Sequence, residues 1–176
     1  MYLLLFLSAL LAEIIGTIAG FGSSTVFLPL ALLFLNFKTA LVLVAFFHIF
    51  GNISRVSFFK HGLDRNLLTS FGLPSVILTI VGALRGAFLT AFKLPKERYI
   101  ATASAIALAV DFTRLPIYIA QGFLSKEFYW YIPILLILAV TGSYIGKQIV
   151  TKIPQQSFRK LVLVALIIVG FKFIFY

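Results

Sequence analysis

Hydrophobic residues fill long stretches of the chain, which short groups of polar residues and glycines interrupt. About 20 apolar residues in an α-helix are enough to cross the hydrocarbon core of a bilayer. The pattern predicts about seven helical segments, near residues 2–18, 23–36, 39–58, 67–91, 98–119, 127–150 and 156–175. The first two are short and flank the sequence AGFGSS, so we expect a broken pair that either crosses and returns or dips in as a re-entrant hairpin.

Composition places all of these segments in a membrane. The chain is 61% hydrophobic and 11% charged, with a mean hydropathy of +1.09, whereas soluble domains are roughly 45–50% apolar. The predicted fold class is therefore an all-α, polytopic membrane helical bundle, a single transmembrane domain over residues 1–176. Cysteine is absent and only 2 histidines occur, which excludes disulfides and argues against metal and haem sites. We expect no cofactor, and no nucleophile–base pair that would indicate an enzyme.

Basic residues predict partners and topology. The net charge of +10 would suggest nucleic acid for a soluble protein, but lysines and arginines here lie mostly at the ends of apolar runs, so we expect contact with lipid and not with nucleic acid. Whether the first pair crosses and returns or is re-entrant, the N-terminus and Lys38 lie on one side of the membrane. That side would also hold Lys93, Lys96, Arg98, Lys147, Lys152, Arg159 and Lys160. The other side would hold Lys60, Arg65, Lys126 and Lys172, so the positive-inside rule predicts a cytoplasmic N-terminus.

An internal repeat follows the Gly-rich pair at 1–38. Asn52, Ser54 and Arg55 recur as Asp111, Thr113 and Arg114, about 60 residues later. Glycines and prolines match in the same order, namely Gly62 with Gly122, Gly82 and Gly86 with Gly142 and Gly146, and Pro95 with Pro154. The repeats are predicted to span 39–96 and 97–176. Such repeats are typical of transporters, with the substrate site between the copies, although a duplicated structural hairpin without a transport role is the alternative.

The two polar groups of the repeat lie deep in their helices, past the midplane and at one level. An arginine at the centre of a transmembrane helix costs about 2.5–3.5 kcal/mol, so each needs a partner or a watery cavity. Asp111 and Arg114 are spaced to share one helix face and neutralise each other. Asn52 cannot neutralise Arg55, which predicts that Arg55 offers positive charge to an anion. Alternatively, Arg55 snorkels to the outer headgroups.

Two further polar residues are candidates for coupling or gating. Glu13 falls near the midplane of the first segment, where it can pair with Arg55 or Arg114 when no substrate is bound, carry a proton, or form a purely structural ion pair. His48, four residues before Asn52, shares the face of that residue. It either lines the cavity or is a hydrogen-bonded histidine of the core.

Glycines have two predicted uses. Gly20 and Gly22 break the first helix pair, and Ser23 and Ser24 can cap the next helix, whose free amides and positive dipole end would face an anion. A simple Gly-Ser turn is the alternative. The Gly-x-x-x-Gly pairs at 82/86 and 142/146 predict closely packed helices, on buried faces or at a dimer seam.

Several stretches together resemble the TauE/SafE sulfite exporter family of bacterial membrane transporters. They are GTIAGFGSSTVFLPLALLF, ALVLVAFFHIFGNISRVSFFKHGLD, ATASAIALAVDFTRLPIYIAQGFLS and AVTGSYIGKQIV. The resemblance covers most of the chain. It implies a protein of the bacterial cytoplasmic membrane that moves sulfite, organosulfonates or related small anions, commonly outward and coupled to an ion gradient.

The sequence departs from this family in one respect. Members have two halves that each begin with a Gly-rich broken pair, and here the second pair is missing. Only one helix then separates the third and fifth segments, which predicts that they run parallel, whereas family members resemble inverted repeats. A homodimer that supplies two Gly-rich breaks to one pathway is our hypothesis for this difference.

The predicted site lies between the helix break and the third and fifth segments. Its substrate-binding residues are Gly20, Gly22, Ser23, Ser24, Asn52, Arg55, Asp111, Thr113 and Arg114, with Glu13 and His48 for coupling or gating. The predicted function is export of a small sulfur oxyanion by an ion-coupled, alternating-access mechanism. A passive anion channel and a nontransporting assembly protein are the alternatives.

Overall fold

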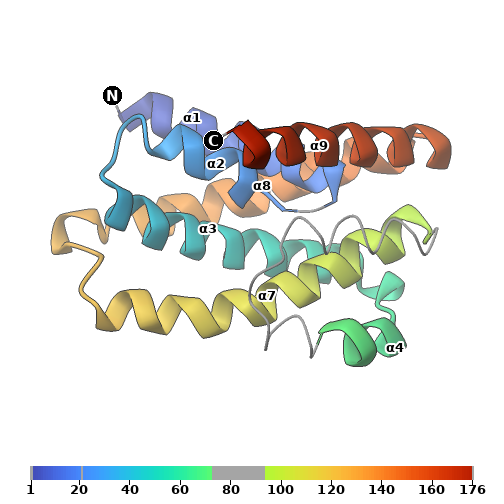
Figure 1. The fold of residues 1–176 in the computed structure, drawn as a ribbon, viewed down its shortest axis with the longest axis horizontal. Coiled ribbons are helices and arrows are strands. Elements are labelled where there is room, and N and C mark those ends of the chain that lie inside the picture. Colours follow the sequence, from blue (N-terminus) through green and yellow to red (C-terminus); the bar gives the residue numbers. More distant parts are fainter. Residues whose placement is uncertain (1, 21, 73–93, 176) are drawn as a thin grey trace.

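The described part of the chain folds into a bundle of helices (Figure 1). The computed structural model describes residues 2–20, 22–72 and 94–175. Its α-helices are α1 (Tyr2–Ala19), α2 (Ser24–Ala31), α3 (Phe37–Phe58), α4 (Arg65–Leu67), α7 (Lys96–Ala120), α8 (Tyr131–Lys152) and α9 (Gln155–Phe175). Short helical turns occur at η1 (Lys60–Gly62), η2 (Leu68–Gly72) and η3 (Lys126–Phe128). The described residues contain no strand, so the predicted all-α class is confirmed.

Local sequence signals fix where these helices begin and end. Asn36 caps α3, because its side chain accepts a hydrogen bond of 3.0 Å from the amide of Thr39. Gly20 and Gly122 follow the ends of α1 and α7 with positive φ angles of 77° and 67°, a conformation that glycine adopts without a steric penalty. Most predicted boundaries agree with these limits. Beyond Gly72, the predicted fourth segment (67–91), with Gly82 and Gly86, lies outside the described residues.

Within the described residues, four stretches are long and apolar enough to cross a membrane: α1, α3, α7 and residues 126–152. In contrast, α2 has only 8 residues and is about 12 Å long, less than half of a bilayer core. The α1–α2 connection packs against the middle of α3, where Gly22 contacts His48. The expected break between the first two helices is therefore confirmed, and it lies inside the bundle.

Helix α7 runs opposite to α3. Gly62, just after α3, packs against the backbone of Glu97 near the start of α7, and Lys38, near the start of α3, lies 5.4 Å from the ring centre of Phe123, just after α7. The expectation that these two helices run parallel is wrong. It assumed a single crossing between them, whereas the chain leaves α3 and enters α7 at the same end of the bundle.

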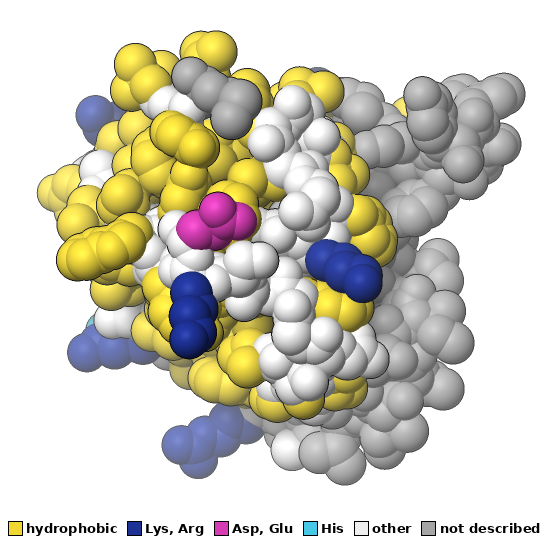
Figure 2. All heavy atoms as spheres, turned by 90° about the vertical axis from the view of Figure 1, so that its left-hand side faces the viewer, with side chains coloured by type: hydrophobic (Ala, Val, Ile, Leu, Met, Phe, Trp, Pro, Cys, Tyr) yellow, Lys and Arg dark blue, Asp and Glu magenta, His cyan; other side chains and the backbone are white. Residues whose placement is uncertain are grey.

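The same geometry corrects the predicted distribution of basic residues. Arg98 pairs with Asp64 at 3.6 Å, and Lys96 donates to the carbonyl oxygen of Val150 at 2.9 Å, so both lie at the end of Lys60, not with Lys38. Because α8 runs parallel to α1, with the rings of Tyr2 and Tyr131 5.7 Å apart, the end of α8 also lies there. Figure 2 shows the opposite end, where hydrophobic side chains surround scattered charged ones.

The described Gly-x-x-x-Gly pair brings α8 against α1. A Cβ atom added to Gly142 would lie 2.8 Å from Cβ of Glu13, and one added to Gly146 would lie 2.6 Å from Cβ of Thr17. Only glycine allows this separation, because larger residues would push the helices apart. The predicted use of this pair in close helix packing is confirmed, and the packing is within one chain.

Candidate functional site

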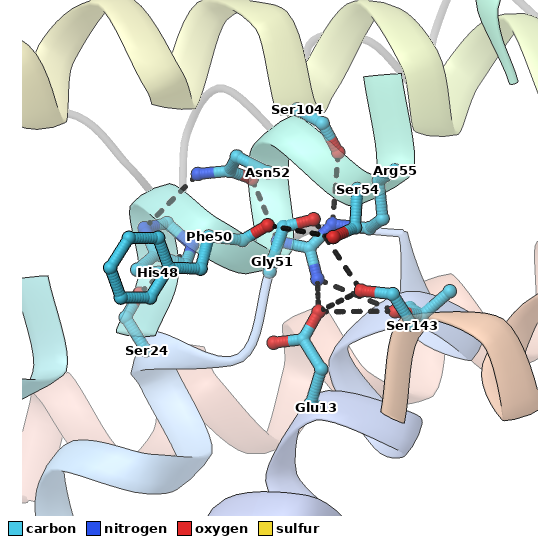
Figure 3. Close-up of polar contacts among 12 residues, drawn as sticks. Glu13, Ser24, His48, Phe50, Gly51, Asn52, Ser54, Arg55, Ser104 and Ser143 are labelled. Atoms are coloured by element: carbon cyan, nitrogen blue, oxygen red, sulfur yellow. Dashed lines mark hydrogen bonds and ion pairs between the residues drawn. The ribbon is translucent and has the colours of Figure 1, made fainter. Parts of the chain in front are cut away.

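A fully buried ion pair lies at the centre of the bundle (Figure 3). Glu13 of α1 and Arg55 of α3 are each 0% exposed, and Nη1 of Arg55 donates to Oε1 of Glu13. The guanidinium also donates from Nη2 to Oδ1 of Asn52 at 2.7 Å and from Nε to Oγ of Ser104 at 3.0 Å. Arg55 is thus held by three different helices, and the cost of burying its charge is offset by a carboxylate and by hydrogen bonds.

Only one of the two carboxylate oxygens of Glu13 accepts hydrogen bonds from the described residues. Its Oε1 accepts from Oγ of Ser143 at 2.6 Å and from Oγ1 of Thr17 at 3.4 Å, in addition to Arg55. Its Oε2 is buried without a hydrogen-bond partner among the described residues. The sequence reasoning missed Thr17, Ser104 and Ser143; the signal for Ser143 was its position beside Gly142, on the face predicted to pack closely.

A second cluster joins α3 to α7. Nδ1 of His48 lies 2.6 Å from Oδ2 of Asp111, to which Nδ2 of Asn52 also donates at 3.1 Å. On the other carboxylate oxygen, Nη2 of Arg114 donates to Oδ1 at 2.7 Å. The predicted pairing of Asp111 with Arg114 is confirmed, and so is the placement of His48 on the face of Asn52. Because His48 is only 3% exposed and is hydrogen-bonded, it is the core histidine of the two alternatives.

Asn52 connects the two clusters. Its side chain accepts from Arg55 and donates to Asp111, the residue that matches Asn52 in the sequence repeat. Two repeat-equivalent side chains therefore contact each other directly, across two antiparallel helices. This is the contact expected if a local two-fold axis relates α3 and α7, and it brings both polar groups to one depth as predicted.

The structure reverses the expected charge asymmetry. Glu13 of another helix pairs with Arg55, which confirms one of the alternatives for Glu13. Arg55 therefore does not offer an unpaired charge, and the snorkelling alternative is wrong because Arg55 is fully buried. Arg114 is instead the more accessible arginine, with a side chain 44% exposed. Two arginines and two carboxylates are thus paired, and this network has no net charge when His48 is neutral.

The helix break borders this network at His48. Oγ of Ser24, at the start of α2, lies 3.5 Å from Nε2 of His48, and Gly22 has a φ of 101° and contacts the same ring. Ser23 occupies the N-cap position but its side chain makes no capping hydrogen bond, so that prediction is wrong. Its Oγ is buried and has no hydrogen-bond partner among the described residues.

Two of the predicted substrate-binding residues are not part of this arrangement. Gly20 packs on the ring of Tyr99, near the start of α7. Thr113 is exposed and donates to the carbonyl oxygen of Val110 in its own helix, at 2.7 Å. The hydroxyl expected from Thr113 is therefore absent from the network, since its helix face points away from α3.

Fold and site together define a polytopic membrane protein whose spans enclose a charged, hydrogen-bonded network beside a broken helix, an organisation typical of transporters. The chain belongs to the sulfite exporter TauE/SafE family, whose sequence model matches residues 5–91 and again residues 86–173. The resemblance seen in the sequence is thereby confirmed, together with a role in the membrane transport of sulfur-containing anions at the level of the family. No curated protein and no solved structure matches the chain significantly.

Proposed function

We propose that this protein exports a small sulfur oxyanion, sulfite or an organosulfonate, across the bacterial cytoplasmic membrane by ion-coupled alternating access. The family supports the substrate class. The observation that carries the proposal is the position of the helix break, inside the bundle and beside a buried network of arginines and carboxylates. Buried charges of this kind are costly, and in membrane proteins they mark substrate and ion pathways.

The anion site that we propose lies at the start of α2. A half-helix N-terminus offers unpaired amides and a positive dipole end, which suit an oxyanion. The hydroxyl of Ser23, which has no partner, and the hydroxyl of Ser24 are available as further donors. Arg114 offers further hydrogen-bond donors nearby while it stays paired with Asp111, and Arg55 and Asn52 hold the network in position. Rocking of one group of helices against the other would open this site to each side in turn.

The orientation that we now propose is the reverse of the first expectation. Basic residues concentrate at the end of the bundle where α3 finishes and α7 begins: Lys60, Arg65, Lys96, Arg98, Lys147, Lys152, Arg159 and Lys160. Among the residues whose side chains the structure describes, the opposite end has Lys38 and Lys126. The positive-inside rule then favours a cytoplasmic location for the basic end and an external N-terminus.

A homodimer remains our hypothesis for how the missing second Gly-rich pair is supplied. Gly142 and Gly146 are already in contact with α1 of the same chain, so the seam of a dimer would have to lie on another face. The mass of the purified protein in detergent tests this hypothesis, and a monomer that transports would contradict it.

Transport itself is tested with labelled sulfite in proteoliposomes under an imposed pH gradient. We expect saturable, gradient-driven flux from the wild type and a reduced flux from Arg114→Gln, whose side chain is accessible enough for the substitution to be tolerated. Arg98→Gln is the matched control, because it removes a similarly exposed arginine from a carboxylate outside the network. Equal flux from both variants would contradict the site, linear flux without gradient dependence would favour a channel, and no wild-type flux would contradict transport.

A further inference from the structure

We propose that His48 takes up the proton that accompanies each anion, so that the anion site becomes positively charged only when this imidazole is protonated. The inference rests on the proposed function and identifies its coupling group. It follows from the charge balance of the buried network and from the hydrogen bond that orients the imidazole.

Charge balance gives the first argument. Arg55 is paired with Glu13 and Arg114 with Asp111, so the four ionised groups cancel. A neutral network offers no net attraction to an anion, and adding an uncompensated negative charge to a buried site is costly. One proton on His48 gives the network a single positive charge, which one bound anion would neutralise.

The orientation of the imidazole gives the second argument. Nδ1 of His48 lies 2.6 Å from Oδ2 of Asp111, and an ionised carboxylate only accepts hydrogen bonds, so Nδ1 carries a hydrogen. In the neutral ring Nε2 is then an acceptor, and its lone pair points toward Ser24 and Gly22 at the helix break. A bound proton converts Nε2 into a donor that faces the same place. The proton forms an N–H bond there and can donate to an oxyanion.

Among the groups around His48, the imidazole itself is the one that we expect to gain or lose a proton. Asn52 on α3 is not titratable, and α2 contributes the hydroxyl of Ser24. Asp111 on α7 lies within hydrogen-bond distance of His48, Asn52 and Arg114, so both of its oxygens are occupied. Arg55 and Glu13 lie behind Asn52 and are paired with each other. Histidine is the side chain whose ordinary titration falls between about pH 5 and 8.

Binding linked to a proton predicts a specific pH dependence. Wherever the unliganded His48 is neutral, the affinity for an anion should fall about tenfold for each pH unit, as expected when binding takes up one proton. Wherever it is already protonated, the affinity should be constant. Because the anion and the proton bind at the same break and leave together, their fluxes run in the same direction. An outward gradient of the anion therefore drives export, and an inward proton gradient opposes it.

The test uses methanesulfonate as the probe, since it stays ionised and takes up no proton itself, unlike sulfite. We expect the purified wild type in weakly buffered detergent solution to take up about one proton per bound methanesulfonate near pH 7, reported by a pH-sensitive dye. His48→Gln should bind at least about tenfold more weakly, without pH dependence and without proton uptake. His61→Gln is the matched control, because His61 is the other histidine and is exposed in η1.

A second measurement leaves His48 intact. Nitrogen NMR of histidine-labelled His61→Gln protein observes His48 alone, and methanesulfonate should convert its neutral ring into imidazolium at constant pH. Binding without this conversion, or proton uptake that persists in a folded His48→Gln protein, would overturn the inference while leaving transport intact. Failure of the wild type to bind any sulfonate or sulfite at every pH would overturn both the inference and the proposed function.

Discussion

The buried pair of Glu13 and Arg55 makes a quantitative prediction. In Glu13→Gln the shape of the side chain is kept and Ser143 can still donate to the remaining carbonyl oxygen, but Arg55, at 0% exposed, loses its counter-ion. Breaking a buried ion pair from one side costs about 3–5 kcal/mol. Because Asn52 and Ser104 still accept from the guanidinium, we expect a loss near the lower limit, about 3 kcal/mol.

A double-mutant cycle separates this pairing from general disruption. If the cost arises from an unpaired charge, Glu13→Gln combined with Arg55→Gln should lose less than the two single variants together. We expect the difference, the coupling energy, to be at least about 2 kcal/mol. The control pair is Asp64 and Arg98, where the arginine side chain is 53% exposed and 3.6 Å from the carboxylate. Exposed pairs contribute about 0–1 kcal/mol.

The assay is the free energy of unfolding in bicelles, from equilibrium denaturation with sodium dodecyl sulfate followed by the loss of helical circular dichroism. Stability effects of the two single variants that simply add would refute the argument that the pair compensates buried charge. So would a Glu13→Gln variant no less stable than Arg98→Gln. Either result would mean that water or lipid headgroups reach Arg55.

Three further predictions concern packing, capping and topology. Gly146→Ala should destabilise the bundle by about 1–3 kcal/mol, because the added Cβ would lie 2.6 Å from Thr17, and thermal denaturation in detergent measures this loss against an alanine at exposed Gln148. Lys96→Met should cost about 1–2 kcal/mol in the same assay, since its ammonium donates to carbonyl oxygens at the end of α8; an equal loss in exposed Lys152→Met would contradict that role. Because the chain has no cysteine, single cysteines report topology: an impermeant maleimide should label Gln121→Cys on intact cells and His61→Cys only after permeabilisation, and the reverse would overturn the proposed orientation.

The sequence by itself determined what depends on spacing along one helix. Runs of apolar residues predicted the spans, Gly20 and Gly22 marked the break, and the spacing of Asp111 and Arg114 predicted their pairing. The pairing could be predicted because residues three or four positions apart lie on one face of any α-helix. The repeat also identified Asn52 and Asp111 as equivalent, although it did not indicate that the two side chains touch.

Only the tertiary structure decided which helices face one another. The partner of Arg55 lies 42 positions away in α1, and that contact depends on how α1, α3 and α8 pack, which no local pattern encodes. The direction of α7 depends on whether the chain crosses the bilayer between α3 and α7. That direction also decides at which end of the bundle the basic residues gather. An error of one crossing reverses every later element, whereas the pairing of charges within a helix is unaffected.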